Sequence, residues 1–129
     1  NGVYNIFNDH LNDFNGIPTP PTLVAIVDCL SRKGWISDAL NLYDKHSKHL
    51  KSYDNKLRAL NPILFGCKEF NDIETAEYIV ELIQNIVYKY NVNYRALLLP
   101  YFVLSNIYGQ NKMDYKMDII RKKRNRIQD

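Results

Sequence analysis

The chain has 129 residues, of which 46% are hydrophobic and 24% charged, and its formal net charge is +3. This composition is that of an ordinary soluble protein and excludes a collagen-like or wholly disordered chain. The longest apolar run, residues 96–104, is too short for a membrane span of about 18 residues, so we expect no membrane partner. The only cysteines, Cys29 and Cys67, exclude a disulfide framework and a four-cysteine metal site, and they favour a reducing compartment. No charged-then-apolar leader opens the sequence, so we expect a processed chain or a piece of a longer one.

Apolar residues recur at helical spacing in seven blocks, and none alternates as a strand would. The blocks lie at residues 3–11, 23–30, 36–43, 63–67, 73–87, 97–108 and 113–120. Turn-forming residues separate most of them, near residues 15–21, 33–34, 70–72, 90–93 and 109–111. Pro21 suits a first helical turn, and both Ser37–Asp38 and Asn71–Asp72 stand where helix N-caps are expected. The sequence therefore predicts an all-α fold.

The block at residues 97–108 is apolar on nearly all sides, which predicts a helix buried between neighbours. We expect the surrounding tyrosines to pack in the core or between helices, with Tyr94 the best candidate for exposure. These tyrosines are Tyr88, Tyr90, Tyr94, Tyr101 and Tyr108. Trp35, which follows a glycine, is expected to pack against a neighbouring helix pair.

Three segments align without gaps around a turn residue. The turn residues are Gly34, Asn71 and Lys112, which gives periods of 37 and 41 residues. Five residues later the first two segments have Ala39 and Ala76, and Gly2 lies one period before Ala39. We expect these three small residues at close helix–helix contacts, whereas the third segment has Met117. Periods slightly above 34 residues are typical of tetratricopeptide-like solenoids of helical hairpins.

The predicted organisation is a solenoid of about three and a half helix pairs. Residues 1–19 form the second half of a truncated repeat, and the following units span residues 20–56, 57–93 and 94–129. The residues in excess of a 34-residue period fall in connectors near 46–56 and 84–94.

Motifs along the chain resemble the C-terminal end of a pentatricopeptide repeat (PPR) protein of the organellar RNA-editing type. Residues 13–19 are similar to the segment that ends a repeat, and residues 26–34 resemble the stretch "MVDLLGRAG". Residues 64–67 and 71–77 are similar to the first E motif, "LLSAC…GNVELAE". Residues 101–108 and 120–122 resemble the second, "YVLLSNIY…VRK".

The resemblance implies a PPR-type helical solenoid in which the fifth and last residues of a repeat read one RNA base. The fifth position falls on Val24 in one unit and on Asn61 in the next, and the last position falls on Asn55 or Lys56. An apolar Val24 has no group to pair with a base edge, so we expect little base reading there, whereas Asn61 and Lys56 are expected to contact RNA. In the family, E motifs are credited with holding protein partners or a deaminase. The His-x-Glu and Pro-Cys-x-x-Cys motifs of the zinc deaminases do not occur in this chain.

The C-terminal segment is the strongest direct chemical signal. Residues 112–129 hold seven Lys and Arg against three Asp and Glu, a net charge of +4 that leaves −1 for residues 1–111. Five of the cations lie within six residues: Arg121, Lys122, Lys123, Arg124 and Arg126. They are expected either to neutralise RNA phosphates or to form only a solvated helix end.

The other candidate residues do not predict a functional site. His46 and His49 could share a helix face, but no third metal ligand is evident, so we expect a solvated connector. No carboxylates converge as a catalytic pair and no phosphate-binding glycine loop occurs. We therefore expect no catalytic residue, no metal and no cofactor.

The sequence favours a non-enzymatic RNA-binding and adaptor module of an organellar PPR protein that supports RNA editing or processing. Its expected partners are RNA, either an organellar transcript or ribosomal RNA, and proteins of an RNA-processing or ribosomal assembly. Its expected location is the mitochondrion, or alternatively another organelle. Two alternatives remain open: a PPR-type structural subunit of a mitochondrial ribosome or similar particle, and a tetratricopeptide-like adaptor that binds only proteins.

Overall fold

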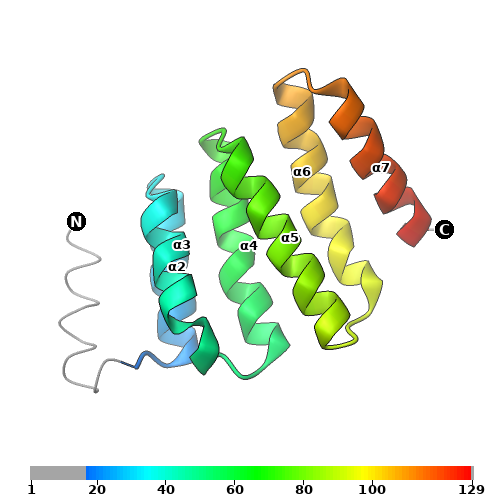
Figure 1. The fold of residues 1–129 in the computed structure, drawn as a ribbon. Helices are drawn as coiled ribbons and strands as arrows, with labels where there is room; N and C mark the ends of the chain where they lie inside the picture. The colour runs from blue at the N-terminus through cyan, green and yellow to red at the C-terminus, as the bar shows by residue number, and fades with distance from the viewer. Residues whose placement is uncertain (1–16, 129) are drawn as a thin grey trace. The chain divides into compact units, whose positions relative to one another are not determined.

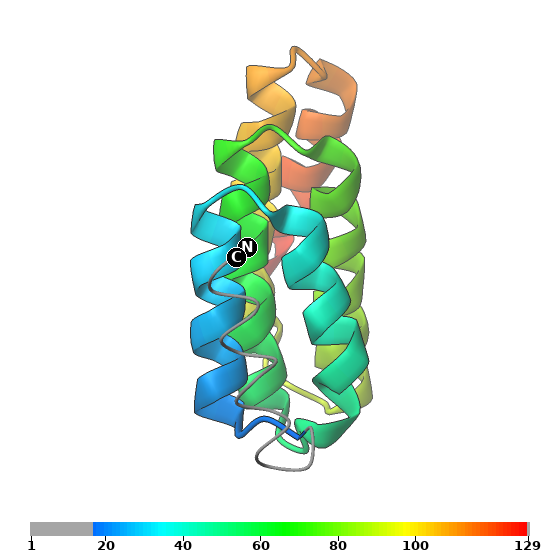
Figure 2. The same cartoon turned by 90° about the vertical axis from the view of Figure 1, so that its left-hand side faces the viewer.

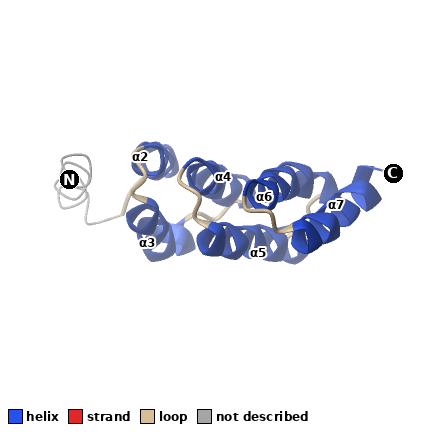
Figure 3. Cartoon of the chain, turned by 90° about the horizontal axis from the view of Figure 1, so that it is seen from above, coloured by secondary structure: helices blue, strands red, loops and turns tan. Residues whose placement is uncertain are grey.

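The structure is a computed structural model that describes residues 17–128. Figure 1 shows its helices, which are α2 (Pro20–Arg32), α3 (Ile36–His46), the 3₁₀ helix η1 (Ser47–His49), α4 (Tyr53–Glu69), α5 (Ile73–Lys89), the 3₁₀ helix η2 (Tyr94–Leu97), α6 (Leu98–Gln110) and α7 (Asp114–Gln128). Within the described residues there are helices and loops and no strand (Figure 3). The predicted all-α fold is confirmed. The predicted block at residues 3–11 and the contact predicted for Gly2 lie outside the described residues.

The described residues form two compact units that divide after Gly66, so α4 continues from the first unit into the second. In the first unit α2 and α3 form an antiparallel hairpin (Figure 2). Buried apolar side chains of this unit come from α2, α3 and α4, and they include Leu23, Val27, Leu30, Ala39, Leu42, Leu60 and Ile63. The 3.6-residue spacing of these side chains explains why each segment folds as a helix with one buried face.

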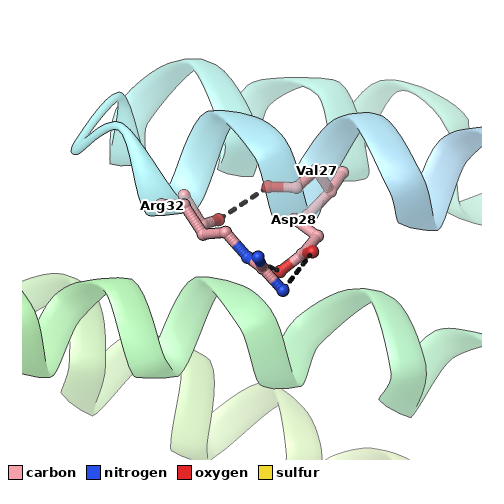
Figure 4. A network of polar contacts seen from close by, with 4 residues as sticks. Val27, Asp28 and Arg32 are labelled. Carbon is pink, nitrogen blue, oxygen red and sulfur yellow. Dashed lines mark hydrogen bonds and ion pairs between the residues drawn. The ribbon is translucent and has the colours of Figure 1, made fainter.

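The start of α2 follows from its first residues. The Thr19 side chain accepts a hydrogen bond from the backbone N–H of Thr22 at 3.4 Å, and prolines occupy the first two helical positions. Proline fits there because its missing N–H would have no helical partner. Farther along α2, exposed Arg32 pairs with Asp28 at 3.1 Å between Nη2 and Oδ2 (Figure 4).

In the second unit α6 packs against both α5 and α7. The buried apolar side chains here include Ala76, Ile79, Ile83 and Val87 of α5, Leu104 and Ile107 of α6, and Ile120 of α7. Glu77 also connects all three helices. It accepts a hydrogen bond from the Tyr108 hydroxyl at 2.6 Å and pairs with Lys116 at 3.0 Å.

The three turn residues predicted to be equivalent share one backbone conformation. Their φ angles are positive, at 84° for Gly34, 55° for Asn71 and 56° for Lys112. After each, the next N–H donates to the carbonyl five residues earlier, in the pairs Trp35–Leu30 (3.0 Å), Asp72–Cys67 (2.9 Å) and Met113–Tyr108 (2.9 Å). This is the Schellman arrangement that ends many helices. The sequence alignment therefore identified positions that are equivalent in local structure.

One predicted cap is confirmed and one is wrong. Asp72 caps α5, since its Oδ1 accepts a hydrogen bond from the Thr75 N–H at 3.1 Å. Ser37 and Asp38, by contrast, lie inside the first turn of α3, whose N-cap is Trp35 without a side-chain hydrogen bond. The Schellman turn at Gly34 directs the chain into the next helix at once, which leaves no room for a later cap.

The connector predicted for residues 46–56 ends earlier than expected. Helix α4 begins at Tyr53, directly after Ser52, whose Oγ accepts a hydrogen bond from the Asn55 N–H at 3.2 Å. The predicted unit boundary between residues 56 and 57 therefore lies inside α4. The boundaries predicted after residues 19 and 93 coincide with the starts of α2 and η2.

Helix α6 is less enclosed than its composition indicates. Leu99 and Phe102 are 44% and 48% exposed, while the opposite face of the helix is buried. The helix is buried between neighbours as predicted, since most of its residues are buried against α5 and α7, but these helices leave one face of α6 uncovered. Trp35 is 37% exposed and lies beneath the Lys33 ammonium, which is 5.5 Å from its ring centre.

Candidate nucleic-acid interface

A hollow of about 360 Å³ lies in the second unit. Residues of α5, η2, α6 and α7 line it: Tyr88, Tyr94, Leu97, Tyr101, Lys123, Arg126 and Ile127. These segments meet because η2 contacts both α5 and α7, and α6 continues directly from η2. Its volume lies in the lower part of the range of ordinary small-ligand sites.

Two tyrosine rings form an exposed wall of the hollow. Tyr88 and Tyr94 are each 57% exposed. Their ring centres are 5.8 Å apart and their planes are inclined by 79°, an edge-to-face pair. The exposure predicted for Tyr94 is confirmed, whereas the core position expected for Tyr88 is wrong. Tyr88 lies near the C-terminal end of α5, where η2 covers only part of the helix.

Tyr101 is a buried, neutral residue of the hollow. It is 2% exposed, and its hydroxyl donates a hydrogen bond to Gln84 Oε1 at 2.5 Å. Burial, together with the neighbouring Tyr88, raises the pKa of Tyr101 to about 12, so the phenol carries no charge at neutral pH. The base of the hollow is therefore apolar, with Leu97 and Ile127 beside Tyr101.

The turn between α5 and η2 positions the tyrosines. Asn91 has a positive φ of 53°, and the Val92 N–H donates to the Val87 carbonyl at 3.0 Å, which ends α5. Asn93 then begins η2, since its Oδ1 accepts a hydrogen bond from the Arg95 N–H at 2.9 Å. Asparagine suits both positions because its short amide tolerates a left-handed backbone and caps a helix. The chain thus reverses and brings Tyr94 back beside Tyr88.

The hollow lies in a part of the unit without acidic side chains. Residues 82–113 and 119–128 contain no Asp or Glu. Lys123 and Arg126 line the hollow and are exposed, and Arg95 is exposed on η2. Lys89 lies 5.4 Å from the Tyr90 ring centre, close in sequence to Tyr88. The hollow therefore attracts anions.

The five cations predicted as one phosphate-binding cluster lie on different sides of α7. Lys123 and Arg126 line the hollow, whereas Lys122 pairs with Asp118 at 3.0 Å. Arg124 lies over Phe102, with 5.7 Å between its guanidinium carbon and the ring centre. Arg121 is exposed. A helix distributes consecutive side chains around its axis, so the structure joins only two of the five to the hollow.

The residues predicted to read bases lie in the first unit. A smaller hollow of about 290 Å³ there is lined by Pro21, Val24, Ala25, Asn55 and Arg58. It brings together Val24 and Asn55, the predicted fifth position and one of the two candidates for the last position. Lys56 lies elsewhere, because its Nζ donates to the Ser47 carbonyl at 2.8 Å, and half-buried Asn61 does not line this hollow.

The sequence analysis missed the pairing of Tyr88 with Tyr94. The available signal was the spacing of two tyrosines across a turn that contains Asn91 and Asn93, together with two cations three residues apart in the tail. Periodicity alone did not reveal the pair, because it assigns Tyr88 to a core or inter-helix position and does not show where α5 ends.

The small residues predicted at helix contacts are consistent with tight packing. Ala39 and Ala76 are fully buried. Gly66, which the analysis did not single out, occupies a still closer position: a Cβ there would lie 2.6 Å from Ile36 Cδ1 and 2.9 Å from the Ser31 carbonyl oxygen.

No group of three or more His, Cys, Asp or Glu side chains in residues 17–128 is arranged to hold a metal ion. Burial lowers the pKa of His46, and the nearby charges of Lys45, His49 and Lys48 lower it further. Within the same residues, no helix has the length and apolar character needed to cross a membrane. Comparison with known proteins finds no match among protein-family models, curated proteins or solved structures.

Proposed function

We propose that this chain is a non-catalytic module that binds single-stranded RNA through the hollow of the second unit. The observation that carries the proposal is the presence of two exposed tyrosine rings and two exposed cations around one hollow. Proteins that bind single strands combine aromatic side chains, on which bases stack, with positive charges that follow the backbone. Tyr88 and Tyr94 supply the first element, and Lys123 and Arg126 the second.

Recognition by this hollow is insensitive to base sequence. A base edge is read by side chains held in place against it, such as the amides of Asn or Gln or a bidentate guanidinium, whereas Lys123 and Arg126 are exposed side chains free to follow the phosphates. The residues that line the hollow offer phenol hydroxyls, an ammonium, a guanidinium and apolar groups. Stacking and phosphate contacts therefore supply the affinity, and both are available with any base.

In a wider context, we propose a PPR-like solenoid of about three and a half helical hairpins, similar to the E-motif end of an organellar RNA-editing or RNA-processing factor. The support is the left-handed turn residue common to Gly34, Asn71 and Lys112 at repeat-like spacing, together with the motifs in the sequence. This function places the chain in a mitochondrion or another organelle, with RNA and proteins of the same assembly as its partners.

The hollow of the first unit supports the same proposal. Val24 and Asn55 line it together, as expected for the two positions that face one base in a PPR repeat. Val24 contributes only apolar contact. With only the Asn55 amide to pair with a base edge, we expect weak base discrimination from this unit as well.

One observation favours a second function, that of a protein adaptor. Leu99 and Phe102 present an apolar surface on α6, and exposed neighbouring apolar side chains mark many protein interfaces. This surface is distinct from the tyrosine-lined hollow, so both functions are compatible with one chain.

Fluorescence anisotropy with a labelled oligouridine RNA tests the proposal. Tyr94→Ala removes one stacking ring and should weaken binding about tenfold, since a stacked base contributes about 1–3 kcal/mol. Tyr115→Ala is the matched control, because Tyr115 is 80% exposed on α7 but does not line the hollow. Equal affinities of the wild type and the Tyr94→Ala variant would contradict the proposal.

A further inference from the structure

Helix α7 distributes its cations between two edges. Lys123 and Arg126 line the tyrosine hollow, whereas Arg124 lies over Phe102 of α6, 5.7 Å from the ring centre. Arg121 precedes Arg124 by three residues and is therefore on the same side of the helix. The second edge is thus a cationic surface separate from the hollow.

Beside this edge, α6 exposes two large apolar side chains. Leu99 is 44% exposed and Phe102 48%, and three residues separate them, so they are neighbours on one helix face. Leu99, Phe102, Arg121 and Arg124 are called the α6–α7 patch below. An apolar centre with a charged margin is typical of a protein interaction surface.

The two arginines of the patch lack negative partners within residues 17–128. The ion pairs there use Arg32, Arg58, Lys116 and Lys122, and not Arg121 or Arg124. Asp118, the acid nearest to Arg121 in sequence, is engaged by Lys122. Arg124 Nε is also buried without a hydrogen-bond partner among the described residues. The patch therefore combines apolar surface with uncompensated positive charge.

We propose that the α6–α7 patch docks an acidic amphipathic helix of a protein partner. The apolar stripe of such a helix covers Leu99 and Phe102, and carboxylates along its edge pair with Arg121 and Arg124. Arginine suits this role because its guanidinium binds a carboxylate through two parallel hydrogen bonds. An amphipathic helix laid on an apolar helical surface is a recurrent mode of recognition.

An RNA strand fits this patch less well than a protein helix does. Leu99 offers no ring for a base to stack on, and one face of Phe102 is already covered by Arg124. Burial of Leu99 and Phe102 becomes favourable against apolar side chains, which a helix supplies and a sugar–phosphate backbone does not. The proposal is independent of RNA binding by the hollow.

The test uses two synthetic helical peptides about five turns long. Both carry leucine on one face; the first has glutamate along the edges of that face and the second has lysine. Fluorescence anisotropy of the labelled glutamate peptide should show saturable binding to the wild-type chain, and the lysine peptide should not bind. Phe102→Ser should weaken binding about tenfold or more. Because the ring is only 48% exposed and lies under Arg124, binding of this variant is measured well below its own melting temperature.

Charge reversal provides the decisive comparison. Arg121→Glu with Arg124→Glu should abolish binding of the glutamate peptide and allow binding of the lysine peptide. Lys122→Glu with Arg126→Glu makes the same change in net charge on the other side of α7 and should retain the glutamate peptide. The proposal would be overturned if the glutamate peptide failed to bind or if both double variants lost equal affinity for it. Displacement of the peptide by oligouridine would overturn it too, as would sedimentation that shows the chain to self-associate through the patch.

Discussion

Glu77 shows how one side chain connects three helices. Its carboxylate on α5 accepts the Tyr108 hydroxyl of α6 at 2.6 Å and pairs with Lys116 of α7 at 3.0 Å. The hydrogen bond from Tyr108 is the main cause that holds the pKa of Glu77 below its ordinary value, and Lys116 contributes in the same direction against the effect of burial. The ionised form is therefore favoured in the folded chain.

This carboxylate makes stability depend on pH. Because the pKa of Glu77 is lower in the folded chain than in the unfolded chain, the ionised carboxylate stabilises the fold. This stabilisation is complete above the unfolded pKa of about 4.3 and is lost as the pH falls through the folded pKa. Glu77→Gln should cost about 1–2 kcal/mol at pH 7. The difference from the wild type should be smaller at about pH 3, because the pH has then fallen below the unfolded pKa and toward the depressed folded pKa of Glu77. Urea unfolding at the two pH values measures it, and a difference independent of pH would contradict this role.

Lys112 is a residue whose backbone conformation costs stability. Its φ of 56° lies in the left-handed region, where a residue with a Cβ is strained. Lys112→Gly should therefore stabilise the chain by about 0.5–1 kcal/mol. Gln110→Gly, at the last residue of α6, should destabilise it by a similar amount, because glycine weakens a helix. Thermal melting distinguishes them, and destabilisation by both substitutions would mean that the turn is misassigned.

At the scale of the elements, Gly66 determines how closely α4 approaches α2 and α3 in the first unit. An added Cβ would meet Ile36 Cδ1 at 2.6 Å and the Ser31 carbonyl oxygen at 2.9 Å. The backbone oxygen cannot move without shifting α2. Gly66 is therefore a packing requirement, even though glycine is a poor helix former.

Gly66→Ala should destabilise the chain by about 1–3 kcal/mol, because overpacking outweighs the gain in helix propensity. Gly109 is a matched control on α6, since a Cβ there would meet only the flexible Met117 Sδ at 3.2 Å. Gly109→Ala should be neutral or stabilising by up to about 1 kcal/mol. Chemical denaturation measures both variants. Equal effects would show that propensity, and not the contact with α2 and α3, governs Gly66.

The helices themselves were predictable from sequence because apolar periodicity and turn residues are local signals. Alignment alone identified the turn residues Gly34, Asn71 and Lys112, and the structure shows that they share a left-handed backbone conformation. The exposure of Tyr88 and the uncovered face of α6 were not predictable, since both depend on where neighbouring helices end. The separation of the tail cations into two groups was not predictable either. Composition shows that the segment is basic, but only the packing of α7 shows which cations lie near Tyr88 and Tyr94.

At the scale of the whole molecule, charge is distributed unevenly along the chain. Residues 112–129 carry a net charge of +4, while residues 1–111 carry −1. Single-strand binding driven by phosphate neutralisation depends strongly on salt, with a slope set by the number of phosphate contacts. We expect those contacts from Lys123 and Arg126 at the tyrosine hollow and not from the tail as a whole.

The salt dependence of RNA affinity tests this central claim most directly. In anisotropy titrations with homopolymer RNAs at several salt concentrations, Lys123→Gln with Arg126→Gln should lower the log–log slope by about 1.4, since each lost contact contributes about 0.7. The loss should be the same for every base. Arg121→Gln with Arg124→Gln removes equal charge at the α6–α7 patch and should leave the slope nearly unchanged. An unchanged slope in the first variant, or equal changes in both, would contradict the account.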